Sequence, residues 1–218
     1  MKSLFQSGTE AACRVFLAGA AGSVGRPLCR LLVADGVHVI GTTRSAEKAS
    51  MLASMGVEPV VVDVYDRDAL IRAVVSARPD VVIHQLTDLP AVFDPATLPA
   101  ALVRNARVRD EGTRNLVAAA VAVGAKRLIA QSIAFSISDA LIAFEQQVLD
   151  APLDGIILRY GQFYGPGTWT AVPPSAPPVL YVDAAAAAAR RAMIDLAPGR
   201  YVVTDADGIV PCAADFGR

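Results

Sequence analysis

The sequence predicts an α/β fold with a doubly wound parallel sheet and helices on both faces. Short apolar runs alternate with helical patterns along most of the 218 residues. The runs are rich in valine and isoleucine and are apolar on both faces, as expected for buried parallel strands. The first run leads directly into a turn with three glycines and then into an apolar helix. Together these observations predict one α/β domain.

The expected elements follow one another in strict alternation. Strands are predicted at residues 15–18, 37–42, 59–63, 81–85, 127–131, 155–160 and 200–204. Helices are predicted at residues 24–35, 46–55, 66–77, 98–123, 139–149 and 182–196. Because right-handed crossovers join such strands, the sheet should be parallel, and ligands should bind beyond the carboxyl ends of the strands.

Two proline-rich stretches interrupt this order. Residues 86–99 are predicted to form a loop over the sheet edge, and residues 165–178 are predicted to be irregular. The six alanines at 184–189 predict a tightly packed helix, since alanine is the best helix former. We expect residues 1–13 to be an N-terminal extension and residues 14–218 to be one domain. The substrate subdomain should be small or absent, because little chain follows Trp169.

Composition excludes several classes of protein. The net charge of −1 offers no basic surface for nucleic acid or for an anionic membrane. The apolar runs are too short to span a bilayer, and the first residues lack the apolar core of a signal peptide, so a cytoplasmic protein is expected. Three scattered cysteines and two histidines match neither a disulfide framework nor a metal site.

The glycine turn predicts a phosphate-binding site. Gly19 permits a sharp turn after the strand, Gly22 lets a pyrophosphate approach the backbone, and Gly25 lets the helix pack on the strand. The first amides of the helix and its dipole then face the phosphates. This is a Rossmann-type dinucleotide site, and its cofactor-binding residues are expected to be Gly19, Ala21, Gly22, Ser23, Val24 and Gly25.

The end of the second strand favours NADP(H), with NAD(H) still open. An acidic residue there would bind the adenosine ribose of NAD, whereas this chain has Thr43, Arg44 and Ser45. The guanidinium of Arg44 suits a 2′-phosphate, and the two hydroxyl groups add hydrogen-bond donors. A solvated arginine at a helix start is the competing interpretation.

With these loops placed, residues 14–204 resemble the extended or atypical short-chain dehydrogenase/reductase superfamily, in its epimerase/dehydratase-like branch. The matching segments are the glycine turn, Val62-Asp63-Val64 and the stretches 80–87, 111–116, 126–132 and 158–167. The resemblance implies that Asp63 and Val64 contact adenine, and that Gln85, Leu86 and Thr87 pass under the ribose and pyrophosphate. It also suggests a nucleotide-sugar substrate and a homodimer formed through helices 98–123 and 139–149.

The chemical half of the family's site is missing from the sequence. Family enzymes use a tyrosine and a lysine four residues later to exchange a proton during hydride transfer. None of the three lysines has a tyrosine four residues before it, and the corresponding positions hold Ile137 and Leu141. The remaining catalytic candidates are Ser132, Tyr160 and Tyr164. His84 is either a polarising group or a packed histidine that holds a loop.

Two functions fit these observations. The first is an NAD(P)-dependent oxidoreductase or an epimerase homologue with a non-standard active site. Direct hydride transfer to a flavin- or quinone-like acceptor needs less acid–base help than carbonyl reduction, so it is compatible with the missing pair. The second is a non-catalytic sensor that binds NADP(H) and signals to a partner. The intact glycine turn and Arg44 argue against a purely structural domain.

Overall fold

The computed structural model describes residues 12–212, so most of the predicted extension at 1–13 lies outside the described residues. The central sheet has eight strands in the order β10-β9-β6-β5-β4-β1-β2-β3. All neighbours in it are parallel except β9 and β10. Its strands are β1 (Arg14–Ala18), β2 (His38–Thr43), β3 (Glu58–Val61), β4 (Val81–His84), β5 (Arg127–Ile133), β6 (Asp154–Tyr160), β9 (Gly199–Thr204) and β10 (Gly208–Pro211).

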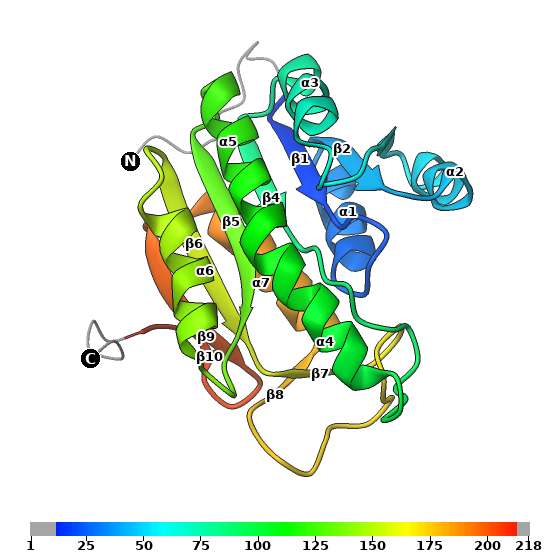
Figure 1. Cartoon of the computed structure of the whole chain (residues 1–218), viewed down its shortest axis with the longest axis vertical. Helices are drawn as coiled ribbons and strands as arrows, with labels where there is room; N and C mark the ends of the chain where they lie inside the picture. Colours follow the sequence, from blue (N-terminus) through cyan, green and yellow to red (C-terminus); the bar gives the residue numbers. More distant parts are fainter. Residues whose placement is uncertain (1–11, 213–218) are drawn as a thin grey trace.

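Helices cover both faces of this sheet (Figure 1). They are α1 (Gly25–Ala34), α2 (Ala46–Ser54), α3 (Arg67–Ala77), α4 (Leu98–Arg107), the π-helical turn η1 (Val108–Gly112), α5 (Thr113–Val123), α6 (Asp139–Leu149) and α7 (Val182–Ile194). Two apolar clusters follow from the alternation of side chains along the strands. One joins the sheet to α1 and α7, and the other joins it to α3, α5 and α6. The predicted fold class is confirmed.

The alanine-rich segment is a tightly packed helix, as predicted. Ala185, Ala186, Ala188 and Ala189 are buried in α7. Because alanine has no side chain beyond Cβ, α7 can approach the sheet and α1 closely. The carboxylate of Asp35 at the end of α1 accepts a hydrogen bond from Arg190 Nε at 2.5 Å, which fastens the two helices together.

The structure adds features that the sequence pattern did not predict. Two short strands, β7 (Gln162–Tyr164) and β8 (Val179–Tyr181), pair in parallel beside the main sheet, and β10 closes its edge. The predicted helix at 98–123 is continuous but contains η1 in its middle. Only residues 161–181 separate β6 from α7, so the described chain has no large substrate subdomain.

Within residues 12–212, no helix is both long enough and apolar enough to span a membrane. The predicted homodimer stays a prediction. Leu102 and Val103 are exposed apolar residues on α4, the first part of one of the two helices expected to form it.

Candidate cofactor site

The glycine turn lies between β1 and α1, at the carboxyl edge of the sheet. Gly19 has a φ of +89°, and a Cβ there would stand 2.7 Å from the carbonyl group of Gln85. Gly22 donates to the Gly19 oxygen at 3.0 Å, and Arg26 donates to the Gly22 oxygen at 3.1 Å. The amides between them precede the first helical bond and point out of the helix end, where a phosphate would be held.

Three further loops meet the glycine turn along this edge. The backbone amide of Gln85 donates to the Ala18 oxygen at 2.8 Å, which places the end of β4 beside the turn. Asn115 on α5 donates through Nδ2 to the Val64 oxygen at 2.9 Å, which holds the loop after β3. Thr43 and Ser45 end β2 and begin α2, where the Ser45 hydroxyl accepts from the Lys48 amide at 3.3 Å. The predicted cofactor residues therefore come from adjacent strand ends.

Arg44 stands at the outer end of this edge, with its side chain 60% exposed. Its nearest acidic partner is Asp88, whose carboxylate lies 3.8 Å away and also faces Arg104 at 3.6 Å. A third cation is close by, since the Arg107 guanidinium lies 3.9 Å from the centre of the Tyr65 ring. Asp88, Arg104 and Tyr65 could not be predicted from the sequence, because a helix or loop pattern does not show which side chains face a neighbouring loop.

The side chains at this edge fit a dinucleotide. Asp63 is exposed and caps its own turn, because its carboxylate accepts from the Tyr65 amide at 3.0 Å. The Gln85 side chain is only 6% exposed, yet neither of its polar atoms has a hydrogen-bond partner among the described residues. Its neighbour Tyr160 donates instead to the Ala185 oxygen at 3.2 Å. A buried amide left unpaired at a ligand edge is a group that a bound ligand can satisfy.

Ser132 is fully buried in β5 and donates to Glu145 Oε1 at 2.6 Å. The same carboxylate accepts from Arg159 Nε and Nη2 at 2.7 and 2.6 Å, and from Arg200 Nε at 2.9 Å. Both Glu145 and Arg159 are removed from solvent, so β5, β6, β9 and α6 are joined by one charged network. The hydroxyl of Ser132 is thus engaged in this network, and its predicted substrate contact stays a prediction.

The two candidate tyrosines also have other partners. Tyr160 is 1% exposed, and burial raises the pKa of its phenol far above the ordinary value. Tyr164 in β7 packs against Tyr181, and the Asp205 carboxylate beside it raises the pKa of its phenol. A raised pKa makes a phenol a poorer proton donor at neutral pH. Their predicted catalytic roles are untested, but neither has a cation that would activate it among the described residues.

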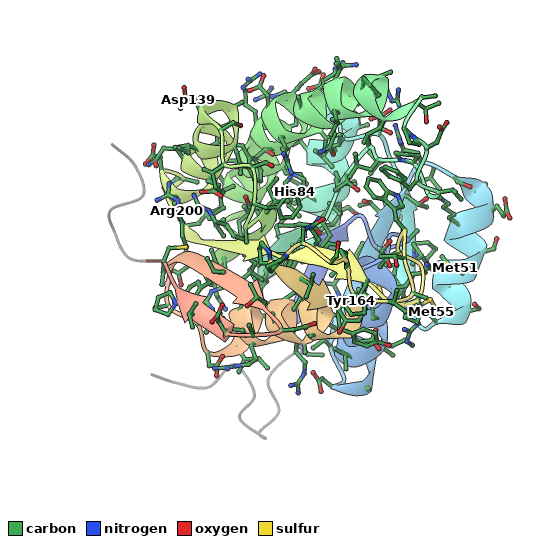
Figure 2. All side chains as sticks on the ribbon, turned by 90° about the horizontal axis from the view of Figure 1, so that it is seen from below. Met51, Met55, His84, Asp139, Tyr164 and Arg200 are labelled. Atoms are coloured by element: carbon green, nitrogen blue, oxygen red, sulfur yellow. The ribbon has the colours of Figure 1, made fainter. Side chains whose placement is uncertain are left out.

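His84 ends β4 and is buried between the sheet and the helices α5 and α6 (Figure 2). The Leu86 amide donates to its Nδ1 at 3.2 Å, so Nε2 carries the proton and donates to Thr113 Oγ1 at 3.0 Å. Burial, helped by the charge of Arg109, lowers the pKa of His84 to about 4. The imidazole is therefore neutral and holds the loop after β4 against α5.

A strap formed by residues 165–178 contacts the glycine turn and the loop after β4. The Ser23 hydroxyl of the glycine turn donates to the Gly167 oxygen at 2.5 Å. Two residues further on, Trp169 Nε1 donates to the Pro90 oxygen at 2.7 Å, and its ring lies 5.2 Å from that of Phe93. The strap thus ties the glycine turn to the loop after β4.

Three features at the carboxyl edge define a dinucleotide-binding protein of the Rossmann type. They are the glycine turn, the free amides at the start of α1 and the unpaired side-chain amide of Gln85. The chain belongs to the NAD(P)H-binding family, which matches it over residues 19–153. Its cofactor is therefore a nicotinamide dinucleotide, which agrees with the resemblance to the extended dehydrogenase/reductase superfamily. Within residues 12–212, no cluster of side chains could hold a metal ion.

One curated relative is a 3-diazoavenalumate denitrifying reductase from a Streptomyces species, 40% identical over 181 residues. The match covers 71% of this chain and 58% of the relative, so the chain spans little more than half the length of that protein.

Solved structures share the fold. The UDP-glucose 4-epimerase of Thermus thermophilus, in complex with NAD, matches with a TM-score of 0.70 and 22% identity, over 88% of this chain and 77% of that one. An anaerobillin reductase of Escherichia coli O157:H7 matches with a TM-score of 0.67 and 20% identity, over 91% of this chain and 99% of that one. The second neighbour is thus covered almost completely by a chain of this size.

Proposed function

We propose that the protein is an NADPH-dependent reductase whose acceptor takes a hydride without a proton from the enzyme. The observation that carries this proposal is the lack of an available acid near the end of β5 in the described chain. By the resemblance to the family, Leu141 and the exposed Ile137 take the positions of its lysine and tyrosine. The Ser132 and Tyr160 hydroxyls donate to Glu145 and Ala185.

The acceptor must react with a hydride without receiving a proton from the enzyme, and a diazonium compound meets this requirement. The name of the curated relative supports this class of acceptor. When bound, the cofactor supplies a hydride from its nicotinamide ring. A diazonium group is an electrophile that takes up a hydride and releases dinitrogen. One diazonium cation and one NADPH give one arene, one dinitrogen and one NADP+, so the reaction balances without a proton. The relative's name describes removal of nitrogen from a diazo compound.

Arg44 supports NADPH as the cofactor, with NADH as the weaker ligand. Its guanidinium is exposed and reaches only the distant carboxylate of Asp88, at 3.8 Å. A 2′-phosphate would offer it a closer, doubly charged partner, and the hydroxyls of Thr43 and Ser45 lie on the same turn. The charge of Arg104 on α4 adds to the attraction.

A non-catalytic NADP(H) sensor is the second candidate, and the same engaged hydroxyls favour it. Epimerisation of a nucleotide sugar is less well supported, because that reaction requires a base to remove a hydroxyl proton. Within the described chain, the only histidine at this edge is buried and held by Thr113 and the Leu86 amide.

Turnover separates the candidates. Purified protein, NADPH and an aryl diazonium salt should give loss of absorbance at 340 nm and release of dinitrogen in equal amounts, faster than without protein. Carbonyls, quinones and UDP-sugars serve as the comparison set. Tight NADPH binding with no oxidation by any acceptor would contradict the reductase and support the sensor. Conversion between UDP-sugars without net NADPH loss would support an epimerase.

A further inference from the structure

Arg109 lies in η1 and takes part in none of the contacts described so far except its effect on His84. The residues four positions before and after it bond to the loop after β4 and to the end of β4. Asn105 accepts from the Asp88 amide at 3.0 Å through Oδ1, and Thr113 bonds to the His84 ring at 3.0 Å. Arg109 lies between them in sequence, and its charge acts on His84 while that of Glu145 acts on it, so its side chain lies near the end of β4. π-Helical turns are frequent at functional sites because they displace one residue from the helical ladder.

The other arginines of this helix have acidic partners. Arg104 faces Asp88 at 3.6 Å, Arg107 pairs with Glu111 at 2.7 Å, and Arg114 pairs with Asp110. Among the described residues, Arg109 forms no hydrogen bond and no ion pair, although its side chain is partly buried. A partly buried guanidinium without a counter-ion is costly, so a site that retains one should bind an anion.

The carboxylate near Arg109 is already engaged. Glu145 is close enough to raise the pKa of Arg109 against the lowering effect of burial. Its oxygens, however, accept hydrogen bonds from Ser132, Arg159 and Arg200. One carboxylate therefore lies near three guanidinium groups, and two of them already take up its hydrogen bonds. The cofactor phosphates would not supply the missing anion, because their site is the glycine turn between β1 and α1.

Aromatic surface lies on the loops of the same sheet edge. Phe93 and Trp169 are 48% and 42% exposed, and their rings lie in contact across the two loops that the strap joins. Val92 and Val172, one and three residues away along these loops, are also exposed. Exposed aromatic rings at a ligand edge offer a stacking surface for a planar, apolar molecule.

We propose that Arg109 binds the carboxylate of the substrate, and that the rest of that substrate is a planar unsaturated or aromatic body lying against Phe93 and Trp169. The inference rests on the proposed reductase, since it specifies the acceptor of that reaction as an aromatic or conjugated acid. Arg109 would then fix the acceptor by its anionic end and leave its electrophilic group free to meet the nicotinamide.

The test compares an acid with its neutral amide. Cinnamate and cinnamamide have the same shape and differ in charge, and their affinities for the protein saturated with NADP+ can be measured by calorimetry. Cinnamate should bind at least 10-fold more tightly. Arg109→Gln should abolish this difference by weakening cinnamate alone, Arg109→Lys should keep part of it, and Arg114→Gln, an exposed arginine of the same helix, should change neither ligand. Trp169→Ala should weaken both ligands alike.

Equal affinities for the two ligands, or no measurable binding of cinnamate, would overturn the proposal, as would a preference that persists in Arg109→Gln. The NADPH affinity and melting temperature of each variant show whether it is folded. If Arg109→Gln does not fold, the comparison on the unmodified protein and on Arg109→Lys still decides. Because binding is measured without turnover, a protein that prefers cinnamate but oxidises no NADPH would refute the reductase and leave the carboxylate site standing.

Discussion

Replacing Glu145 by glutamine should destabilise the protein by about 3–5 kcal/mol, which is the cost of breaking a buried ion pair from one side. Glu145 is fully buried, and Arg159 is 5% exposed. The glutamine keeps the size of the side chain but removes the charge, and its NH2 group would face guanidinium donors. Arg200 is partly exposed and can turn to water, so Arg159 carries most of the loss.

Urea unfolding followed by circular dichroism measures this loss by linear extrapolation. For a chain of this size, each kcal/mol lowers the melting temperature by roughly 2–4 °C, so a fall of roughly 6–20 °C is expected. Arg114→Gln breaks an exposed pair and should cost no more than about 1 kcal/mol. The double variant Glu145→Met/Arg159→Met should be less destabilised than Glu145→Gln, because it leaves no unpaired charge at these two positions.

A loss below about 1 kcal/mol for Glu145→Gln, with an unchanged urea slope, would refute this reasoning. Ser132→Ala tests the hydrogen-bond network around Glu145 by removing its uncharged member, the Ser132 hydroxyl. Removing one hydrogen bond to a charged acceptor should cost about 1.5–3 kcal/mol and leave kcat unchanged. If kcat instead fell more than 10-fold while stability was retained, Ser132 would return to the catalytic site.

Three further predictions concern the cofactor site and its surroundings. Arg44→Glu should weaken NADPH binding by roughly 10- to 100-fold and NADH binding far less, measured by fluorescence titration; equal effects would exclude a contact with the 2′-phosphate. Gly19→Ala should abolish binding of both cofactors, because a Cβ there would meet the Gln85 carbonyl. The control is Gly36→Ala, which has a φ of +75° but open space around it and should cost only about 1–2 kcal/mol of stability. Burial lowers the pKa of His84 from 6.5 to about 4, so between pH 6.5 and 5 only the unfolded chain takes up a proton at this residue. The free energy of unfolding should therefore fall by about 2 kcal/mol as the pH falls through this window. If the same dependence of stability on pH is found in His84→Gln, His84 is not its source.

The sequence was sufficient for seven of the eight strands of the main sheet, because most of these strands are apolar and the helices between them have clear ends. The predicted boundaries of α6 match the structure, and most others differ by one or two residues. β7 and β8 escaped prediction because each has three residues and the two pair across a proline-rich stretch. Short strands carry too little periodicity to detect, and their pairing is set by contacts distant in the sequence.

The cofactor-binding residues could be predicted because the spacing of the glycines and the order of the strands place them at the carboxyl edge of the sheet. The roles of the candidate catalytic residues could not be predicted, because they depend on where the side chains point. Tyr160 is the last residue of β6, and only the structure shows its hydroxyl turned toward α7. Glu145 and Arg159 come from different elements, so their pairing has no local signal. The π-helical turn that contains Arg109 likewise leaves no mark on the helical pattern.

The two outer strands of the main sheet each contain a proline, and both prolines occupy outward-facing positions. The Val62 amide donates inward to Thr43, and the Cys212 amide donates inward to Arg200, so the alternate positions Pro59 and Pro211 face away from the sheet. A proline there removes a donor that a strand from another molecule would need. Growth of the sheet by pairing with a second copy is thereby disfavoured at both borders. Any stable self-association of the described domain should therefore use the helical faces, and Pro59→Val or Pro211→Val should increase its tendency to aggregate.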